Sequence, residues 1–276
     1  MRPEDYPTQE PLSEFAQPYH DEVMRRAQDV EGIEAQYGGD PYQSILVYPA
    51  PEPNGDVLAF IHGGGWANGW KEWMSFMAPA LTGRGVTFAT VGYRLAPMAV
   101  FPSGFEDCLD AVSWLAANVA EHGGEPKRIF VGGHSAGGHY AALMAVRHDW
   151  QAGRGLGADT IRGCLPISGV YDFSAQSGLS ARPRFLGADD SGNEGPASPV
   201  TQIDGTPPPF LIAHGEADFP HLIKQADAMS AALERAGGAV ARLELPGASH
   251  LGASLAAGEA DGLWVTTATD WMRRWP

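Results

Sequence analysis

The segment from residue 128 to residue 146 constrains the fold most, because a short apolar run leads through a glycine-rich turn into an alanine-rich run. The turn has the pattern G-x-S-x-G, with Ser135 at its centre and Gly133 and Gly137 on either side. In this pattern the serine occupies a strained strand-to-helix corner, and glycines two residues away relieve the crowding. The sequence therefore predicts a strand, a helix, and a serine hydroxyl that projects beside the positive end of that helix.

Short apolar runs alternate with runs of helical spacing along the rest of the chain. This alternation predicts the α/β fold class, with a mostly parallel sheet flanked by helices on both faces. In such sheets the reactive loops gather at the carboxyl ends of the strands. Strands are expected at residues 42–48, 57–61, 86–91, 128–131, 161–167, 210–213 and 241–245.

The length of 276 residues suits one large domain, 1–276, without an internal repeat or long linker. Residues 1–41 are polar and predict an N-terminal helical arm, which either packs at the pocket mouth or forms a mobile terminus. Residues 174–208 are rich in Ser, Gly, Asp and Pro, which predicts an irregular insertion or small lid. Ser103 and Glu106 have the spacing of a capping box at the start of a helix.

The chain has 33 acidic and 18 basic side chains and a net charge of −15, which repels phosphate backbones and argues against nucleic acid as a partner. No apolar run approaches membrane-spanning length, and the N-terminus lacks the apolar core of a secretory signal. A cytoplasmic protein without a membrane partner is therefore expected. Cys108 and Cys164 lack metal-ligand spacing, so we expect two buried thiols and neither metal nor cofactor. The oligomeric state is left open, a homodimer included.

The expected strand at 57–61 runs directly into His62, three glycines and Trp66. Successive glycines expose backbone N–H groups with no side chain to block a ligand, which is how a chain forms an anion-binding concavity. The anion expected here is the oxygen of a tetrahedral intermediate, although a flexible loop is the alternative. Trp66 is the tryptophan expected to form a wall of the substrate pocket.

A serine hydroxyl needs a general base, and the base needs an acceptor that holds its tautomer. His250 is the best candidate for the base, in a loop after the last expected strand, and Asp218 is the best candidate for the acceptor. The order Ser135, Asp218, His250 is the one expected for a nucleophile at such a corner. Glu216 and Asp172 remain alternatives to Asp218.

The other histidines fit the role of base less well. His134 and His139 adjoin the serine in sequence, and a neighbour on the same turn usually points away from it. His134 is instead expected at the substrate pocket. His62 and His214 end strands and are expected to brace loops, and His221 lies at the start of a helix.

Taken together, these motifs resemble the α/β-hydrolase superfamily, and within it the carboxylesterase and arylformamidase (kynurenine formamidase-like) branch. The matching stretches are 62–66 (HGGGW), 93–97 (YRLAP), 133–138 (GHSAGG), 214–218 (HGEAD) and the late His250. The resemblance implies a triad of Ser135, Asp218 and His250, and an oxyanion hole from the N–H groups of Gly64, Gly65 and Ala136.

The expected activity is that of a serine hydrolase that cleaves a small carboxylic ester or N-formyl arylamide through an acyl-enzyme. The alternative is a non-catalytic small-molecule binding protein on a hydrolase scaffold, because a fold does not guarantee activity. A nucleotide-binding α/β protein is excluded, since neither a P-loop nor a strand-led G-x-G-x-x-G stretch occurs in the sequence.

Overall fold

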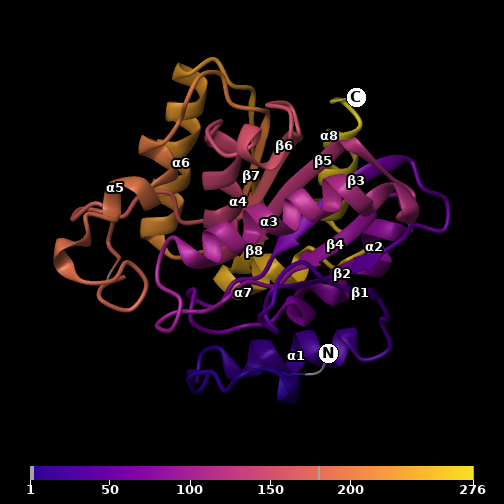
Figure 1. Cartoon of the computed structure of the whole chain (residues 1–276), viewed down its shortest axis with the longest axis horizontal. Coiled ribbons are helices and arrows are strands. Elements are labelled where there is room, and N and C mark those ends of the chain that lie inside the picture. Colours follow the sequence, from indigo (N-terminus) through magenta and orange to yellow (C-terminus); the bar gives the residue numbers. More distant parts are fainter. Residues whose placement is uncertain (1–2, 180, 276) are drawn as a thin grey trace.

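A computed structural model describes residues 3–179 and 181–275 of the chain. Within them, eight strands form a sheet in the order β1-β2-β4-β3-β5-β6-β7-β8 (Figure 1). The strands β1 and β2 are antiparallel to their neighbours, and all pairings from β4 to β8 are parallel. The bounds are β1 Ile33–Gln36, β2 Ser44–Tyr48, β3 Gly55–Ile61, β4 Thr87–Val91, β5 Gly124–His134, β6 Ile161–Ile167, β7 Phe210–Ala217 and β8 Val240–Ser249.

Helices cover both faces of the sheet, because the central strands are apolar on both sides. In β3, Val57, Ala59 and Ile61 pack into one core cluster, and Leu58 and Phe60 pack into the other. The first cluster includes side chains of α3 (Ser103–Asn118), α4 (Ala136–Val146) and α6 (Pro220–Arg235). The second includes side chains of α1 (Gln17–Ala27), α2 (Ala78–Thr82), α7 (His250–Ala256) and α8 (Leu263–Met272). The predicted α/β class is thus confirmed.

The shorter helical segments are mostly 3₁₀ turns that connect these elements. They are η1 Pro3–Asp5, η2 Lys71–Met77, η3 Val119–His122, η4 Ala152–Arg154, η5 Asp189–Ser191 and η6 Pro199–Thr201, together with the one-turn helix α5 Glu194–Ala197. Among the residues described, no helix combines the length and apolar content needed to cross a membrane.

The N-terminal arm packs against the body of the domain, with α1 beneath the sheet in the view of Figure 1. In α1, the Tyr19 hydroxyl lies 2.8 Å from Ser254 Oγ, and His20 Nδ1 accepts a hydrogen bond of 2.8 Å from Trp73 Nε1. The arm contains the helix α1 and also the strand β1, which the sequence did not predict. This strand is short and largely exposed at the edge of the sheet, so it has no alternating apolar pattern.

The segment 174–208 contains η5, α5 and η6 and leaves the sheet at the left of Figure 1. Residue 180 lies outside the described residues. The segment is anchored by Phe185 and Leu186, which are 2% exposed, and by a hydrogen bond from Phe101 N–H to the Phe185 carbonyl. The irregular insertion therefore has a fixed base beside the sheet.

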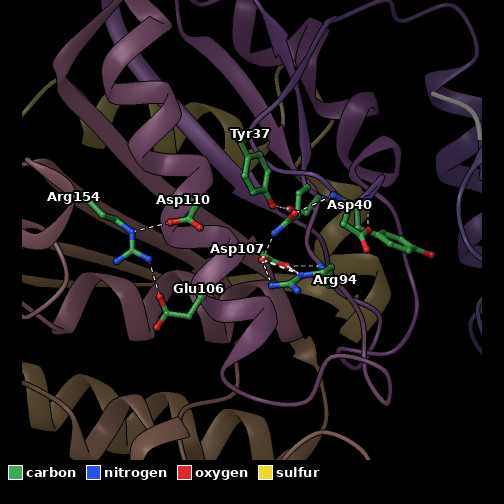
Figure 2. A network of polar contacts seen from close by, with 10 residues as sticks. Tyr37, Asp40, Arg94, Glu106, Asp107, Asp110 and Arg154 are labelled. Carbon is green, nitrogen blue, oxygen red and sulfur yellow. Dashed lines mark hydrogen bonds and ion pairs between the residues drawn. The ribbon is translucent and has the colours of Figure 1, made fainter.

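The predicted capping box is wrong, because α3 begins at Ser103 and its cap residue is Pro102. Glu106 instead accepts a hydrogen bond of 2.7 Å from Arg154 (Figure 2). The same figure shows Arg94, whose guanidinium and backbone N–H both bind the buried carboxylate of Asp107. This contact fixes the loop after β4 to α3.

Candidate active site

Ser135 lies between β5 and α4, at the corner that the sequence predicts. Its backbone has φ 54° and ψ −115°, a conformation that few side-chain-bearing residues adopt. A Cβ at Gly133 would lie 2.3 Å from the Gly137 backbone, and a Cβ at Gly137 would lie 2.0 Å from the Ile61 carbonyl oxygen. Both glycines are therefore needed for the turn to close and for α4 to approach β3.

The last two strands bring Asp218 and His250 together. Ala217 at the end of β7 pairs with Ser249 at the end of β8, so the next residue of each strand lies at the same edge of the sheet. His250 Nδ1 is 2.8 Å from Asp218 Oδ1, and His250 Nε2 is 3.0 Å from Ser135 Oγ. The structure thus brings together the three side chains predicted as a triad, although His250 begins the unpredicted helix α7 rather than lying in a loop.

Asp218 is ionised in this arrangement. Burial tends to raise its pKa, but hydrogen bonds from His250, Ser168 and the Phe219 N–H lower the pKa of Asp218 to about 2. An ionised carboxylate at Nδ1 makes that nitrogen the donor. The lone pair of Nε2 then faces the Ser135 hydroxyl, as a general base requires.

Ser168 is a site residue that the sequence reasoning missed. It follows β6 with φ 52°, is 2% exposed, and donates a hydrogen bond to Asp218 Oδ2. Its backbone N–H donates to the Ala213 carbonyl at 2.8 Å. The available signal was its position, since it is a hydroxyl directly after a central strand at the edge where Ser135 and Asp218 lie.

The alternative acceptors do not contact His250. Glu216 Oε2 accepts from the Gly247 N–H at 2.7 Å and so joins the ends of β7 and β8. Asp172 accepts from the N–H and hydroxyl of Ser174 within its own turn. These two residues therefore stabilise loops, and Asp218 is the acceptor that the geometry selects.

The histidines at strand ends are bound to the backbone. His62 Nδ1 lies 2.7 Å from the Gly63 carbonyl oxygen, and its ring stacks on Tyr93 with centroids 4.3 Å apart. His214 Nδ1 lies 3.0 Å from the Gly215 carbonyl oxygen. Both contacts agree with a bracing role for the two side chains.

The glycines after β3 have conformations that a side chain would disturb. Gly64 has φ 109°, and a Cβ there would lie 2.0 Å from the Asn68 carbonyl oxygen, whereas Gly65 has φ 61° with open space around it. Within the described part of the chain, no protein acceptor binds the N–H groups of Gly64 and Gly65. The N–H of Ala136 is at the first position of α4, where helices leave donors unpaired.

A cavity of about 430 Å³ opens on Ser135 and His250. The glycines at 63–65 and apolar side chains from the N-terminal arm line it. Two charged residues, Glu10 and Arg184, also line it. The apolar and aromatic walls are Leu12, Phe15, Tyr19, Trp73, Phe219 and Leu251.

His134 lines this cavity, as the sequence predicts. Its Nε2 lies 2.9 Å from the His250 carbonyl oxygen, and burial together with the nearby His250 lowers the pKa of His134 to about 3. A neutral ring with that contact donates its proton to the carbonyl, so His134 holds the backbone of His250 and is not the base.

The prediction that Trp66 forms a pocket wall is corrected by the structure, because Trp66 is not among the cavity residues. Its backbone has φ 61°. Its ring lies against the insertion and stacks on Phe185, with the centroids 4.2 Å apart. Its Nε1 donates to His139 Nδ1 at 3.1 Å. Trp66 therefore packs the glycine loop against the insertion and does not line the cavity.

The chain is similar in sequence to curated esterases. Esterase LipC of Mycobacterium tuberculosis is 30% identical over 270 residues, covering 91% of this chain and 66% of LipC. Esterase LipQ of the same organism is 31% identical over 217 residues, covering 73% of this chain and 51% of LipQ. The chain thus spans about half to two thirds of the length of these curated relatives.

Solved structures share the fold. A hyperthermophilic esterase from the archaeon Pyrobaculum calidifontis superposes with a TM-score of 0.78 at 21% identity, covering 94% of this chain and 92% of that one. A family model, BD-FAE, matches residues 45–233, which is more than half of the sequence. This match includes the glycine loop, the serine corner and Asp218. The chain therefore belongs to the BD-FAE family of the α/β-hydrolase superfamily.

Proposed function

We propose that the protein is a serine carboxylesterase that hydrolyses small carboxylic esters through an acyl-enzyme. The observation that supports this most directly is the chain of contacts from Ser135 Oγ through His250 to Asp218, at 3.0 and 2.8 Å, beside a cavity lined by the glycines at 63–65. The similarity to LipC and LipQ, both called esterases, supports the same activity.

In the proposed reaction, His250 Nε2 removes the Ser135 proton as Oγ bonds to the substrate carbonyl carbon. The carbonyl oxygen becomes an oxyanion that accepts hydrogen bonds from the N–H groups of Gly64, Gly65 and Ala136. His250 then gives its proton to the leaving alcohol, and the bond to the leaving group breaks. Water, deprotonated by His250, cleaves the acyl-enzyme and regenerates the Ser135 hydroxyl.

We further propose N-formyl arylamides as a second substrate class, because the same steps cleave an amide when His250 protonates a leaving arylamine. The aromatic side chains around the cavity, Phe15, Tyr19, Trp73 and Phe219, suit an aryl leaving group. A panel of N-formyl arylamines against acetyl and butyryl aryl esters separates the two classes by kcat/KM. Turnover of the esters alone would discard the formamidase part of the proposal.

The central test is Ser135→Ala, which should lower kcat for acetyl aryl esters by about 10⁶-fold with an unchanged melting temperature. Ser113→Ala, on α3 with its hydroxyl bound to the Leu109 carbonyl, is the matched control and should retain activity. Full activity in Ser135→Ala would contradict the proposal. A wild-type protein that binds aryl esters without cleaving them would favour a non-catalytic binding protein instead.

A further inference from the structure

An ion pair between two segments far apart in the sequence lines the cavity. Arg184, from the insertion, pairs with Glu10, from the N-terminal arm, and each side chain is 47% exposed. Both residues line the same cavity as Ser135 and His250. Among the described residues that line this cavity, Arg184 is the permanent cation and Glu10 the carboxylate.

This ion pair is not what holds the arm in place. Gln9 and Gly69 exchange two hydrogen bonds of 2.8 Å, and Asn68 Nδ2 donates to the Glu10 carbonyl at 2.7 Å. An exposed ion pair contributes about 0.2–1 kcal/mol, less than these contacts together. The arm would therefore stay in position if Arg184 exchanged Glu10 for another anion.

The backbone at Arg184 is also held in place. Its neighbour Phe185 is 2% exposed, stacks on Trp66 behind the glycine loop, and accepts a hydrogen bond from the Phe101 N–H. Arg94, in contrast, is bound by the buried Asp107 and has no comparable freedom (Figure 2). Arg184 is thus a cation on an anchored stretch of backbone, and its partner Glu10 can be exchanged for another anion.

We propose that Arg184 binds a free carboxylate on the substrate, and that Glu10 is the internal competitor for that position. On this basis, which rests on the proposed esterase function, the preferred substrates are esters that carry a second, ionised carboxyl group. The molecule's net charge of −15 opposes such substrates at long range, but salt screens that repulsion beyond about 8 Å at physiological ionic strength. The contact at Arg184 lies within this range once the substrate enters.

The test compares two pairs of esters, each with an anionic and a neutral member. Mono(4-nitrophenyl) adipate against its methyl ester places the charge on the acyl side, and 4-carboxyphenyl against 4-carbamoylphenyl acetate places it on the leaving group. The readout is the anionic-to-neutral ratio of kcat/KM, followed across variants so that intrinsic reactivity cancels. Adding salt should lower this ratio in the wild type.

Arg184→Gln should lower the ratio about fivefold in at least one pair, and Glu10→Gln should raise it in that pair by up to about fivefold. Arg273→Gln is the matched control, since Arg273 is 49% exposed and pairs with Asp270 on α8. Both ratios unchanged in Arg184→Gln would overturn the proposal. An equal change in kcat/KM for anionic and neutral esters would also overturn it. In that case the ion pair only holds the arm to the insertion and does not bind substrate.

Binding to Ser135→Ala, followed by tryptophan fluorescence, gives a readout that does not depend on turnover. Tighter binding of the anionic ester, lost when Arg184→Gln is added, supports the inference even if the wild type cleaves no ester. Equal binding of both members of each pair, with and without Arg184→Gln, contradicts it.

Discussion

Asp218 has a lowered pKa although its side chain is buried beside His250. Burial opposes its ionisation, yet three donors stabilise the carboxylate, and the donors come from three different places: His250, Ser168 and the Phe219 backbone. Its charge therefore depends on the folded arrangement of β6, β7 and β8. Both the acid stability of the protein and the orientation of His250 follow from it.

The depressed pKa of Asp218 predicts a loss of stability in acid. A carboxylate whose folded pKa is about 2, against an ordinary 3.8, stabilises the fold above the ordinary value. That contribution, about 2 kcal/mol, is lost as the pH falls from about 4 towards 2. Urea unfolding of the wild type and of Asp218→Asn at several pH values in this range measures the contribution. The slopes of the free energy of unfolding against pH should differ between the two proteins by an amount that corresponds to about one proton. Parallel slopes would contradict the assignment.

Ser168→Ala should raise the pKa of Asp218 and lower kcat by about tenfold, because one carboxylate oxygen loses its donor and His250 is held less firmly. The free energy of unfolding should fall by about 1–3 kcal/mol. Ser230→Ala is the control, since that buried hydroxyl binds the Ala226 carbonyl of its own helix. If the two variants have equal kcat, Ser168 has no positioning role.

At the scale of elements, the sequence predicted the central strands of the sheet and the turns that follow them. The apolar run of β3 and the glycines around Ser135 specify the sheet and the serine corner, because close backbone contacts there admit few other residues. The order of the motifs then predicted Asp218 and His250. These are properties of buried segments, where a side chain has few alternatives.

Other elements could not be predicted, for local reasons. The strand β1 is mostly exposed and has no apolar alternation, and α7 starts directly after β8 without the loop that Pro246 and Gly247 suggested. The ring of Trp66 lies away from the cavity in a left-handed backbone conformation, which a glycine-rich sequence does not reveal. Ser168 acts through a contact across β6 and β7, and no local motif marks it.

The loop after β3 gives a prediction at this scale from two adjacent glycines. Gly64→Ala places a Cβ 2.0 Å from the Asn68 carbonyl oxygen, so the loop must move and its N–H groups lose their alignment. We expect a loss of about 2.7–4 kcal/mol in transition-state stabilisation, measured as kcat/KM for an acetyl aryl ester. Gly65→Ala meets open space and should lose less, mainly the strain of its φ of 61°. The reverse order of the two variants would contradict this reading of the loop.

At the scale of the whole molecule, a buried charged cluster joins the first residues of the arm to the body. The Lys71 ammonium is completely buried, 3.0 Å from Glu34 and 3.1 Å from Glu72, and it also contacts the Tyr6 hydroxyl. Burial and the Glu72 carboxylate raise the pKa of Tyr6. The same N-terminal arm also supplies residues that line the cavity, among them Phe15 and Tyr19.

Lys71→Gln should destabilise the protein by about 3–5 kcal/mol, since it leaves Glu72 buried without its cation. The double variant Lys71→Met/Glu72→Leu removes the two most buried charges, leaves the partly exposed Glu34, and should recover most of that loss. Thermal unfolding measures the stability, and limited proteolysis near residues 8–16 reports release of the arm. A double variant as unstable as the single one would show that the charges do not act as a pair.

The pairing of Ala217 with Ser249 has a consequence for how this chain can change in length. The register of β7 and β8 brings Asp218 and His250 together, so their separation does not depend on the length of the turn between α6 and β8. The turn at Gly237 and Gly238, between α6 and β8, lies at the opposite end of β8 from His250. A foreign domain inserted at this turn should therefore leave the reaction at Ser135 unchanged.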